Sequence, residues 1–183
     1  DNLNLQAATV SLGTTYIAGE DVLSYSGPLT FNWDTASGVL TLSGPDTVAN
    51  YESALASVRY ENLSNAPNTA TRTVNWTVND GIDTSPPASS WITISPVNDA
   101  PIVSSGQTLA YTENDGPAAV DPAIGLTDVD NLNLQAATVS LGTTYIAGED
   151  VLSYSGSLAF NWDTASGVLT LSGPDTVANY ESA

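Results

Sequence analysis

The sequence predicts an all-β protein made of antiparallel Greek-key β-sandwich modules in tandem, with one short helix per module. Thr, Val, Ser and Gly are abundant, 42% of the residues are hydrophobic, and aromatic residues are spread along the chain. Short segments that alternate apolar and polar residues follow one another, separated by turn residues. The chain also repeats itself with a period of 129 residues. An all-β barrel is the structural alternative.

The first half of the chain contains the clearest strand patterns. Ala8, Val10 and Leu12 alternate with polar residues, which predicts a half-buried strand. Farther along, two apolar segments flank a five-residue loop that ends in glycine and are expected to pair as a hairpin: Leu29–Trp33 and Val39–Leu42, around Asp34–Gly38.

Further strands are expected on both sides of a Pro-flanked segment. Val74, Trp76 and Val78 alternate with polar residues, and Trp91–Ile94 forms a last strand. Beyond the Pro-flanked segment, the next module is expected to begin with Ile102–Val103 and Thr108–Thr112. The alternation places Trp76 in the core, whereas Trp91 is out of phase with its apolar neighbours and can be exposed.

One segment departs from the β pattern. Residues 46–58 place Val48, Tyr51 and Leu55 at the spacing of a helix face. Asp46 or Thr47 is the candidate N-cap, because a short oxygen-bearing side chain there can accept a hydrogen bond from a free backbone amide. We therefore expect one short helix packed on an edge or end of the module.

The internal repeat defines the expected domain organisation. Residues 1–54 recur as residues 130–183, and only two of the 54 positions differ: Pro28 becomes Ser157 and Thr30 becomes Ala159. A period of 129 residues is long enough to bury its own core, so it indicates a repeated domain.

The Pro-flanked polar segment 96–101 is the expected linker between modules. Residues 1–100 then form a module without its first strands, and residues 101–183 form the N-terminal part of a second, near-identical module. We expect the chain to be a piece of a longer protein. A module that lacks strands exposes a sheet edge and is expected to pair with a neighbour, exchange a strand or be partly ordered.

Charge and composition exclude several functions. Twenty acidic residues stand against two basic ones, for a net charge of −18, and the chain has no Lys, His, Cys or Met. A zinc site would therefore lack its usual Cys and His ligands, and a Ser-His-Asp triad would lack its histidine base. Nucleic-acid binding and membrane insertion are not expected, because cations are scarce and no apolar run approaches about 18 residues. No pair of carboxylates is fixed in a cleft as glycoside hydrolysis requires, so we expect no enzyme.

The acidic residues near the linker predict a calcium site. Asp128 and Asp130 form an Asp-x-Asp motif, and in an extended chain both side chains point to the same side. Adding Asp99 of the linker and a backbone carbonyl supplies much of the oxygen shell that Ca²⁺ requires, whereas zinc and copper favour imidazole or thiolate. The competing interpretation is a solvated turn, which is common for such short motifs.

A series of motifs resembles the cadherin-like tandem domain of very large, calcium-binding bacterial surface adhesins of the RTX-adhesin type. The motifs occur in the family's order and cover nearly the whole module: Ala100–Val103, Tyr111–Gly116, Leu126–Asp130, Ser37–Thr41, Val78–Gly81 and Pro96–Pro101. The resemblance implies an Ig/cadherin-like sandwich with calcium clamped at each junction between modules.

The resemblance also implies the ligands. At the junction in this chain they are Asn98 (through its carbonyl), Asp99, Asp128 and Asp130. Asp1 matches Asp130 at the preceding junction, and Glu113 would serve the next one. Val97 stands where the family has an Asp, and the family's mid-domain acidic motif is missing, so each junction is expected to hold fewer ions. Three residues remain open as substitutes: Asp46, Glu52 and Glu61.

These observations predict a structural extender repeat, rigidified by calcium, in a large secreted or cell-surface adhesin that acts in cell adhesion and biofilm formation. We expect an extracellular, bacterial protein whose partners are neighbouring repeats of the same chain. The alternative is a module that binds carbohydrate or another copy of itself. A contiguous strip of exposed aromatic side chains would favour carbohydrate binding.

Overall fold

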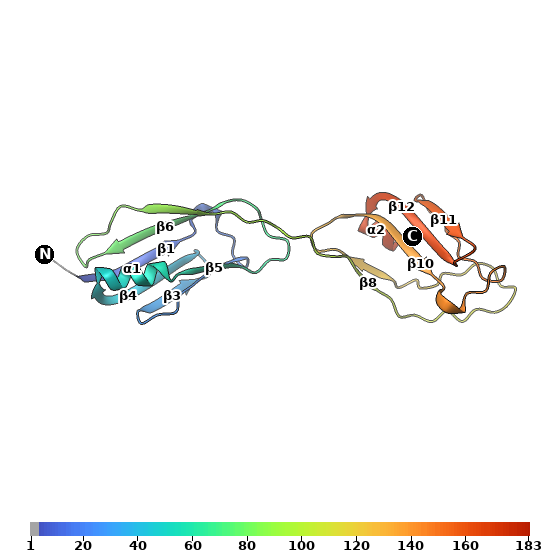
Figure 1. Cartoon of the computed structure of the whole chain (residues 1–183), viewed down its shortest axis with the longest axis horizontal. Coiled ribbons are helices and arrows are strands. Elements are labelled where there is room, and N and C mark those ends of the chain that lie inside the picture. The colour runs from blue at the N-terminus through green and yellow to red at the C-terminus, as the bar shows by residue number, and fades with distance from the viewer. Residues whose placement is uncertain (1–3) are drawn as a thin grey trace. The chain divides into compact units, whose positions relative to one another are not determined.

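The computed structural model describes residues 4–183 and divides into two compact units, unit 1 (Asp1–Val97) and unit 2 (Asn98–Ala183). The division falls inside the segment 96–101 that the sequence indicates as a linker. Asp1, a predicted ligand, lies outside the described residues. Each unit consists mainly of antiparallel strands, so the prediction of an all-β fold is confirmed at this level (Figure 1).

Unit 1 contains two antiparallel sheets and one α-helix. The larger sheet has five strands in the order β3-β4-β1-β6-β7, and β2 pairs with β5 in a second sheet. The elements are β1 (Asn4–Ser11), β2 (Asp21–Ser24), β3 (Thr30–Asp34), β4 (Val39–Thr47), α1 (Val48–Ala56), β5 (Arg59–Asn62), β6 (Arg72–Asn79) and β7 (Ala88–Ile92), with a short 3₁₀ turn at Gly13–Thr15.

The strongest strand predictions are confirmed. Ala8 and Val10 are buried from β1, and Leu12 is buried just beyond its end. β3 and β4 pair as the predicted hairpin, and Gly38 closes its loop with φ +68°, a left-handed conformation that favours glycine.

The predicted helix is present as α1, and Thr47 is its N-cap. The Thr47 hydroxyl accepts a hydrogen bond from the Asn50 amide at 3.2 Å. Tyr51 and Ala54 are buried on the inner face of the helix, which packs against β1 and β4 (Figure 1). The Tyr51 hydroxyl donates to the carbonyl of Gly44 at 2.8 Å and so ties the helix to β4.

The core of unit 1 draws side chains from both sheets and from the helix. Val10, Leu40 and Leu42 of the five-stranded sheet are fully buried. Leu23 from β2 and Tyr51 from α1 belong to the same cluster. Trp76 packs against this cluster, in agreement with the alternation of its strand.

Unit 2 contains a three-stranded sheet in the order β10-β12-β11, and a hairpin-like pair of β8 and β9. The elements are β8 (Ile102–Ser104), β9 (Gly125–Thr127), β10 (Asn133–Ser140), β11 (Ala159–Asp163), β12 (Val168–Thr176) and α2 (Val177–Glu181), with a 3₁₀ turn at Gly142–Thr144. β10, β12, β11 and α2 reproduce β1, β4, β3 and α1, as their near-identical sequences predict.

Two sequence expectations need correction, and three short strands were not predicted. The strand expected at Trp91–Ile94 is β7, which begins earlier, at Ala88, and ends at Ile92. Thr108–Thr112 belongs to no strand, and its residues are exposed. The three short strands that were not predicted are β2, β5 and β9. Each has only three or four residues, which is too few to show an alternation of apolar and polar side chains.

Candidate functional site

The predicted junction ligands lie together at one end of unit 2. Asn98 and Asp99 precede β8, and Asp128 and Asp130 follow β9. Because β8 and β9 are antiparallel, with Ile102 opposite Thr127, the chain entering β8 and the chain leaving β9 lie side by side. The strand pairing therefore brings together residues separated by about thirty positions. We call Asn98, Asp99, Asp128, Asp130 and Asn131 the acidic cluster.

Hydrogen bonds connect the two segments of the acidic cluster. The backbone amide of Asp99 donates to Oδ2 of Asp130 at 3.0 Å. The side-chain amide of Asn131 donates to Oδ1 of Asn98 at 2.8 Å and to Oδ1 of Asp130 at 2.9 Å. The Asn98 side chain donates to the carbonyl of Asp99 at 2.7 Å. Asn131 was not singled out in the sequence, although it directly follows the Asp-x-Asp motif.

Asp128 organises the turn that carries Asp130 and Asn131. Its Oδ1 accepts from the backbone amides of Asp130 at 3.2 Å and Asn131 at 2.9 Å. Burial alone would raise the pKa of the Asp128 carboxyl, but hydrogen bonds from Asn131 and Asp130 outweigh it and hold this pKa below the ordinary value. Asp128 is therefore a fully charged oxygen donor at neutral pH.

The acidic cluster offers only oxygen donors, which suits a hard cation such as Ca²⁺. A carboxylate oxygen has two lone-pair sites, so an oxygen that accepts one hydrogen bond can still bind a cation. Among residues 4–183, no three acidic side chains converge tightly enough to hold a metal ion by themselves. An ion here would need amide or carbonyl oxygens and water in addition to Asp128 and Asp130.

The remaining predicted ligands lie elsewhere. Glu113 is in the exposed turn between β8 and β9, away from the acidic cluster along the chain. The Asp46 carboxylate accepts from the Thr47 amide at 2.8 Å and from the Asn50 side chain at 2.6 Å, so it supports the start of α1. Glu52 and Glu61, the other open substitutes, are exposed.

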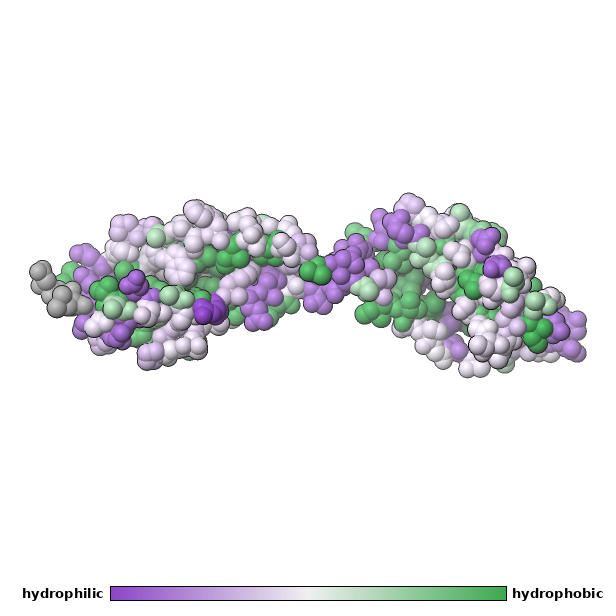
Figure 2. Space-filling model, in the orientation of Figure 1, coloured by the Kyte–Doolittle hydropathy of each residue, from purple (hydrophilic) through white to green (hydrophobic). Residues whose placement is uncertain are grey.

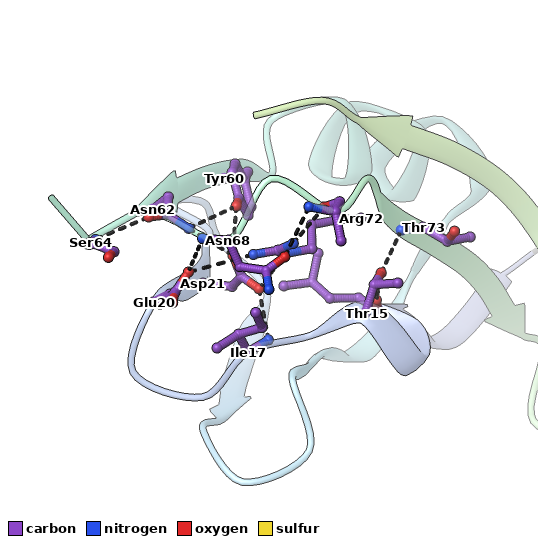
Figure 3. A network of polar contacts seen from close by, with 12 residues as sticks. Thr15, Ile17, Glu20, Asp21, Tyr60, Asn62, Ser64, Asn68, Arg72 and Thr73 are labelled. Atoms are coloured by element: carbon purple, nitrogen blue, oxygen red, sulfur yellow. Dashed lines mark hydrogen bonds and ion pairs between the residues drawn. The ribbon is translucent and has the colours of Figure 1, made fainter. Parts of the chain in front are cut away.

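A second polar constellation, buried in unit 1, was missed in the sequence. Asp21 at the start of β2 and Arg72 at the start of β6 have 1% and 0% exposure (Figure 3). The Nε of Arg72 donates to Oδ2 of Asp21 at 2.7 Å. One signal was available: Arg72 has the same strand phase as Val74, Trp76 and Val78, so alternation directs it into the core.

Asp21 is fully supplied with donors. Tyr60 and Asn62 of β5 donate to Oδ1 at 2.6 and 3.0 Å, and the Ile17 amide donates to Oδ2 at 2.8 Å (Figure 3). Burial alone would raise the pKa of Asp21, but the hydrogen bonds from Arg72, Tyr60 and Ile17 outweigh it and hold the pKa below the ordinary value. Burial and the bond to Asp21 raise the pKa of the Tyr60 hydroxyl.

The rest of the Arg72 guanidinium also points inward. Nη1 donates to the carbonyl of Ala70 at 2.5 Å. Nη2 lies 3.6 Å from Oε2 of Glu20, which is an ionic contact and too long for a hydrogen bond. These contacts join the segment before β2 to β5 and β6, so the constellation has a structural role.

Exposed aromatic side chains do not form a continuous strip in the described part of unit 1, residues 4–97. Trp91 is 69% exposed and Phe31 is 50% exposed. They lie on β7 and β3, which are the opposite edges of the five-stranded sheet. Phe31 also packs edge-to-face on Tyr25, with ring centroids 5.8 Å apart.

Comparison with known proteins gives one partial similarity. A stretch of this chain is 33% identical over 79 residues to halomucin from Haloquadratum walsbyi (strain DSM 16790 / HBSQ001), which corresponds to 39% of this chain and 1% of halomucin. No family model matches the chain, and no solved structure matches it. Among residues 4–183, no helix has the length and apolar character needed to cross a membrane.

Proposed function

We propose that this chain is part of a calcium-rigidified extender repeat of a large secreted or cell-surface adhesin. The observation that carries the proposal is the acidic cluster, in which strand pairing brings Asp99 beside Asp128 and Asp130. The near-identity of residues 1–54 and 130–183 supports a spacer role, because a spacer needs length and regularity more than a unique binding surface.

Calcium fits the acidic cluster by chemistry and position. Asp128 and Asp130 would supply charged oxygens, while Asn98 and backbone carbonyls would supply neutral ones. The segment containing Asn98 and Asp99 leads directly from unit 1 into unit 2. An ion bound by both segments would restrict this connection, which is how a cation would stiffen a string of modules.

The net charge supports the same function. A charge of −18 over 183 residues makes neighbouring modules repel one another, which favours an extended and soluble array. Bound Ca²⁺ would neutralise part of this repulsion locally, at the linker. We also propose that each complete module is an Ig/cadherin-like Greek-key sandwich, since side chains from both sheets of unit 1 share one core.

We place the protein at the cell surface or outside the cell, and the similarity to a stretch of halomucin supports this location. The carbohydrate-binding alternative receives no comparable support, because Trp91 and Phe31 lie on opposite sheet edges.

The test is calorimetric unfolding of the full chain with calcium and with chelator, for the original protein and for Asp128→Asn/Asp130→Asn. At about 5 mM calcium and a Kd of about 0.1 mM, binding would stabilise unit 2 by about 2 kcal/mol. The increase in melting temperature should disappear in the double variant.

A charge-matched control separates a specific site from general screening. Asp115→Asn/Glu149→Gln removes the same two charges from exposed positions of unit 2. This control should keep the calcium response of the original protein. Equal responses of all three proteins, or no response in the original, would refute the calcium proposal.

A further inference from the structure

The sequence contains two acceptor motifs for N-linked glycosylation that the proposed spacer function does not use. The Asn-x-Ser/Thr pattern occurs at residues 62–64 and 75–77, with Asn62 and Asn75 as the acceptors. Both asparagines are half-buried in unit 1, so exposure alone does not distinguish them. Their hydrogen bonds do, because a glycan on the side-chain amide leaves its nitrogen only one N–H to donate.

The side-chain amide of Asn62 belongs to the buried constellation around Asp21. Its Nδ2 donates to Oδ1 of Asp21 at 3.0 Å and to the Tyr60 hydroxyl at 3.4 Å (Figure 3). Its Oδ1 accepts from the Ser64 amide at 3.0 Å. A sugar on Nδ2 would remove one of these donations and bring a bulky polar group against a carboxylate that is 1% exposed. A glycan on Asn62 is therefore incompatible with the folded unit.

The side-chain amide of Asn75 is open to solvent. Its Oδ1 accepts from Oγ of Ser89 on β7 at 2.9 Å, which fixes the orientation of the amide. Among residues 4–183, Nη2 of Arg72 is the only buried side-chain nitrogen or oxygen without a hydrogen-bond partner. Nδ2 of Asn75 has no acceptor among the same residues, so it is not buried and can carry a substituent.

Small residues border the Nδ2 atom of Asn75. In the sheet, Asn75 lies opposite Ser11 of β1 on one side and opposite Ser89 of β7 on the other. Gly13, in the 3₁₀ turn that follows β1, is also close, because a Cβ added there would lie 3.3 Å from Nδ2. These neighbours leave room for a first sugar, whereas large side chains at the same positions would crowd it.

Asn75 and Thr77 lie on the outer face of the five-stranded sheet. They alternate along β6 with Val74 and Trp76, which belong to the core or pack against it. In unit 2, β9 contacts α2 and its Leu126 packs against the core, so the strands that precede the repeated segment lie on the inner side of the sheet. The part of unit 1 where Figure 1 labels β6 is mainly pale in Figure 2, the colour of residues of intermediate hydropathy.

We propose that Asn75 is a glycosylation site that takes an N-linked oligosaccharide and that Asn62 is not. The donor is an oligosaccharide joined to a lipid through phosphate. Nδ2 of Asn75 forms a bond to the anomeric carbon of the first sugar as the bond from that carbon to the phosphate oxygen breaks. The lipid phosphate leaves with the electron pair of that bond, and Nδ2 loses one proton to a base of the transferring enzyme.

The transfer has to occur before β6 joins the sheet. In the folded unit, β6 pairs with β1 on one side and with β7 on the other, so an enzyme cannot draw residues 75–77 into its active site. After folding, a modified Asn75 keeps its bond from Ser89, because that bond uses Oδ1. An Asn62 modified in the unfolded chain cannot complete the bonds around Asp21. The fold therefore selects which modified chains reach the native state.

This inference goes beyond the calcium-dependent spacer function and rests only on the proposed location outside the cell, because such transfer accompanies export. The test sends the full chain through the secretory pathway of a cell line that performs N-glycosylation, which supplies that location. The chain has two Arg and no Lys, so trypsin divides it into peptides 1–59, 60–72 and 73–183. The two acceptor asparagines then lie in different peptides.

Peptide-N-glycosidase in heavy-oxygen water converts each glycosylated asparagine into a labelled aspartate. Mass spectrometry of the secreted protein should find this label at Asn75, in peptide 73–183, and none in peptide 60–72. Thr77→Val removes the hydroxyl that the transfer requires and should abolish the label, whereas Thr77→Ser keeps the hydroxyl and should retain it. Ser64→Ala removes the other motif but keeps the backbone N–H that bonds to Asn62, so the label at Asn75 should be unchanged.

The proposal is overturned if the secreted chain has no label at Asn75, or if it has one at Asn62. Sugar attached to Ser or Thr with Asn75 unmodified would overturn it as well. If little protein is secreted, chains retained in the cell give the same test for Asn75, because the transfer precedes folding. The calcium experiment measures melting temperature and changes Asp128 and Asp130, so each proposal can fail without the other.

Discussion

Arg72 donates from Nε to Oδ2 of Asp21 across 2.7 Å, at a place where neither side chain reaches solvent. The pair joins β6 to the start of β2, and Tyr60 adds β5 through the same carboxylate. A buried charge is tolerated only when it is paired and hydrogen-bonded. Unit 1 therefore depends on the complete set of partners more than on the ion pair alone.

Replacing Arg72 is expected to destabilise unit 1 strongly. Arg72→Leu leaves the Asp21 carboxylate buried without its cation, which should lower the free energy of unfolding by about 3–5 kcal/mol. Hydrogen exchange of the β6 amides in increasing urea would measure the loss within unit 1.

The second arginine of the chain is a suitable control for this replacement. Arg59 is exposed, and within residues 4–183 its guanidinium donates only to the carbonyls of Ala56 and Val58. Arg59→Leu removes the same charge but should change stability by no more than about 0.5 kcal/mol. Similar losses for both variants would mean that the buried pair has no special role.

Acid should destabilise unit 1 through Asp21. The folded pKa of Asp21 lies below its usual value, so the unfolded chain binds a proton at higher pH than the folded chain does. The stability that Asp21 contributes is therefore fully present above the unfolded pKa of about 3.9 and is lost as pH falls through the folded pKa.

The measurement is the difference in unfolding free energy between the original chain and Asp21→Asn. This difference should be constant from about pH 6 to 5 and shrink below about pH 4. A difference that stays unchanged down to the acid-unfolding limit would show that the Asp21 carboxylate is not the titrating group.

Local patterns in the sequence were sufficient for the regular parts of the fold. The alternation around Val10 predicts β1, and the helical spacing around Tyr51 predicts α1. The Asp34–Gly38 loop predicts the hairpin of β3 and β4. Each of these features depends on residues close together in the chain, which is why a single sequence contains the information.

Features that depend on distant partners were not predictable in the same way. The burial of Asp21 requires Arg72, 51 positions away, and no local pattern links the two. The proximity of Asp99 and Asp130 was predicted, but it required the assumption that their flanking segments lie side by side, as β8 and β9 now do. The role of Asn131 as a bridge could not be read from spacing alone.

Glycine at position 38 is expected to be essential for the β3–β4 hairpin. Gly38 has φ +68°, and a Cβ there would lie 2.4 Å from the ring of Tyr16, which packs edge-to-face on Trp33. Gly38→Ala should therefore cost more than the roughly 1 kcal/mol of left-handed strain alone. Chemical denaturation followed by tryptophan fluorescence would measure this loss.

Replacing Gly19 is the control that separates the steric clash with Tyr16 from the strain of a left-handed backbone. It has φ +88°, but a Cβ there would meet no atom within 4 Å. Gly19→Ala should cost only the left-handed strain, so the difference between the two variants isolates the clash with Tyr16. If Gly19→Ala were the more damaging change, the arrangement of Tyr16 over the hairpin loop would be wrong.

Adding a carboxylate to the acidic cluster is expected to strengthen its calcium response. Asn131 donates to oxygens of both Asn98 and Asp130. Asn131→Asp replaces these donors with an additional carboxylate beside Asp130, so the variant should melt at a lower temperature than the original in chelator. With calcium, the added ligand should tighten binding roughly tenfold, about 1.4 kcal/mol, because ligand charge sets the affinity of such sites.

Asn161→Asp provides the control, because it adds the same charge at an exposed position of β11. Titration calorimetry with calcium should give unchanged affinity for this variant and higher affinity for Asn131→Asp. If the two variants bind calcium equally, the ion is responding to the net charge of unit 2 and not to the geometry around Asp128 and Asp130. If only Asn131→Asp gains affinity, the cation lies within reach of position 131, between the linker and the turn that follows β9.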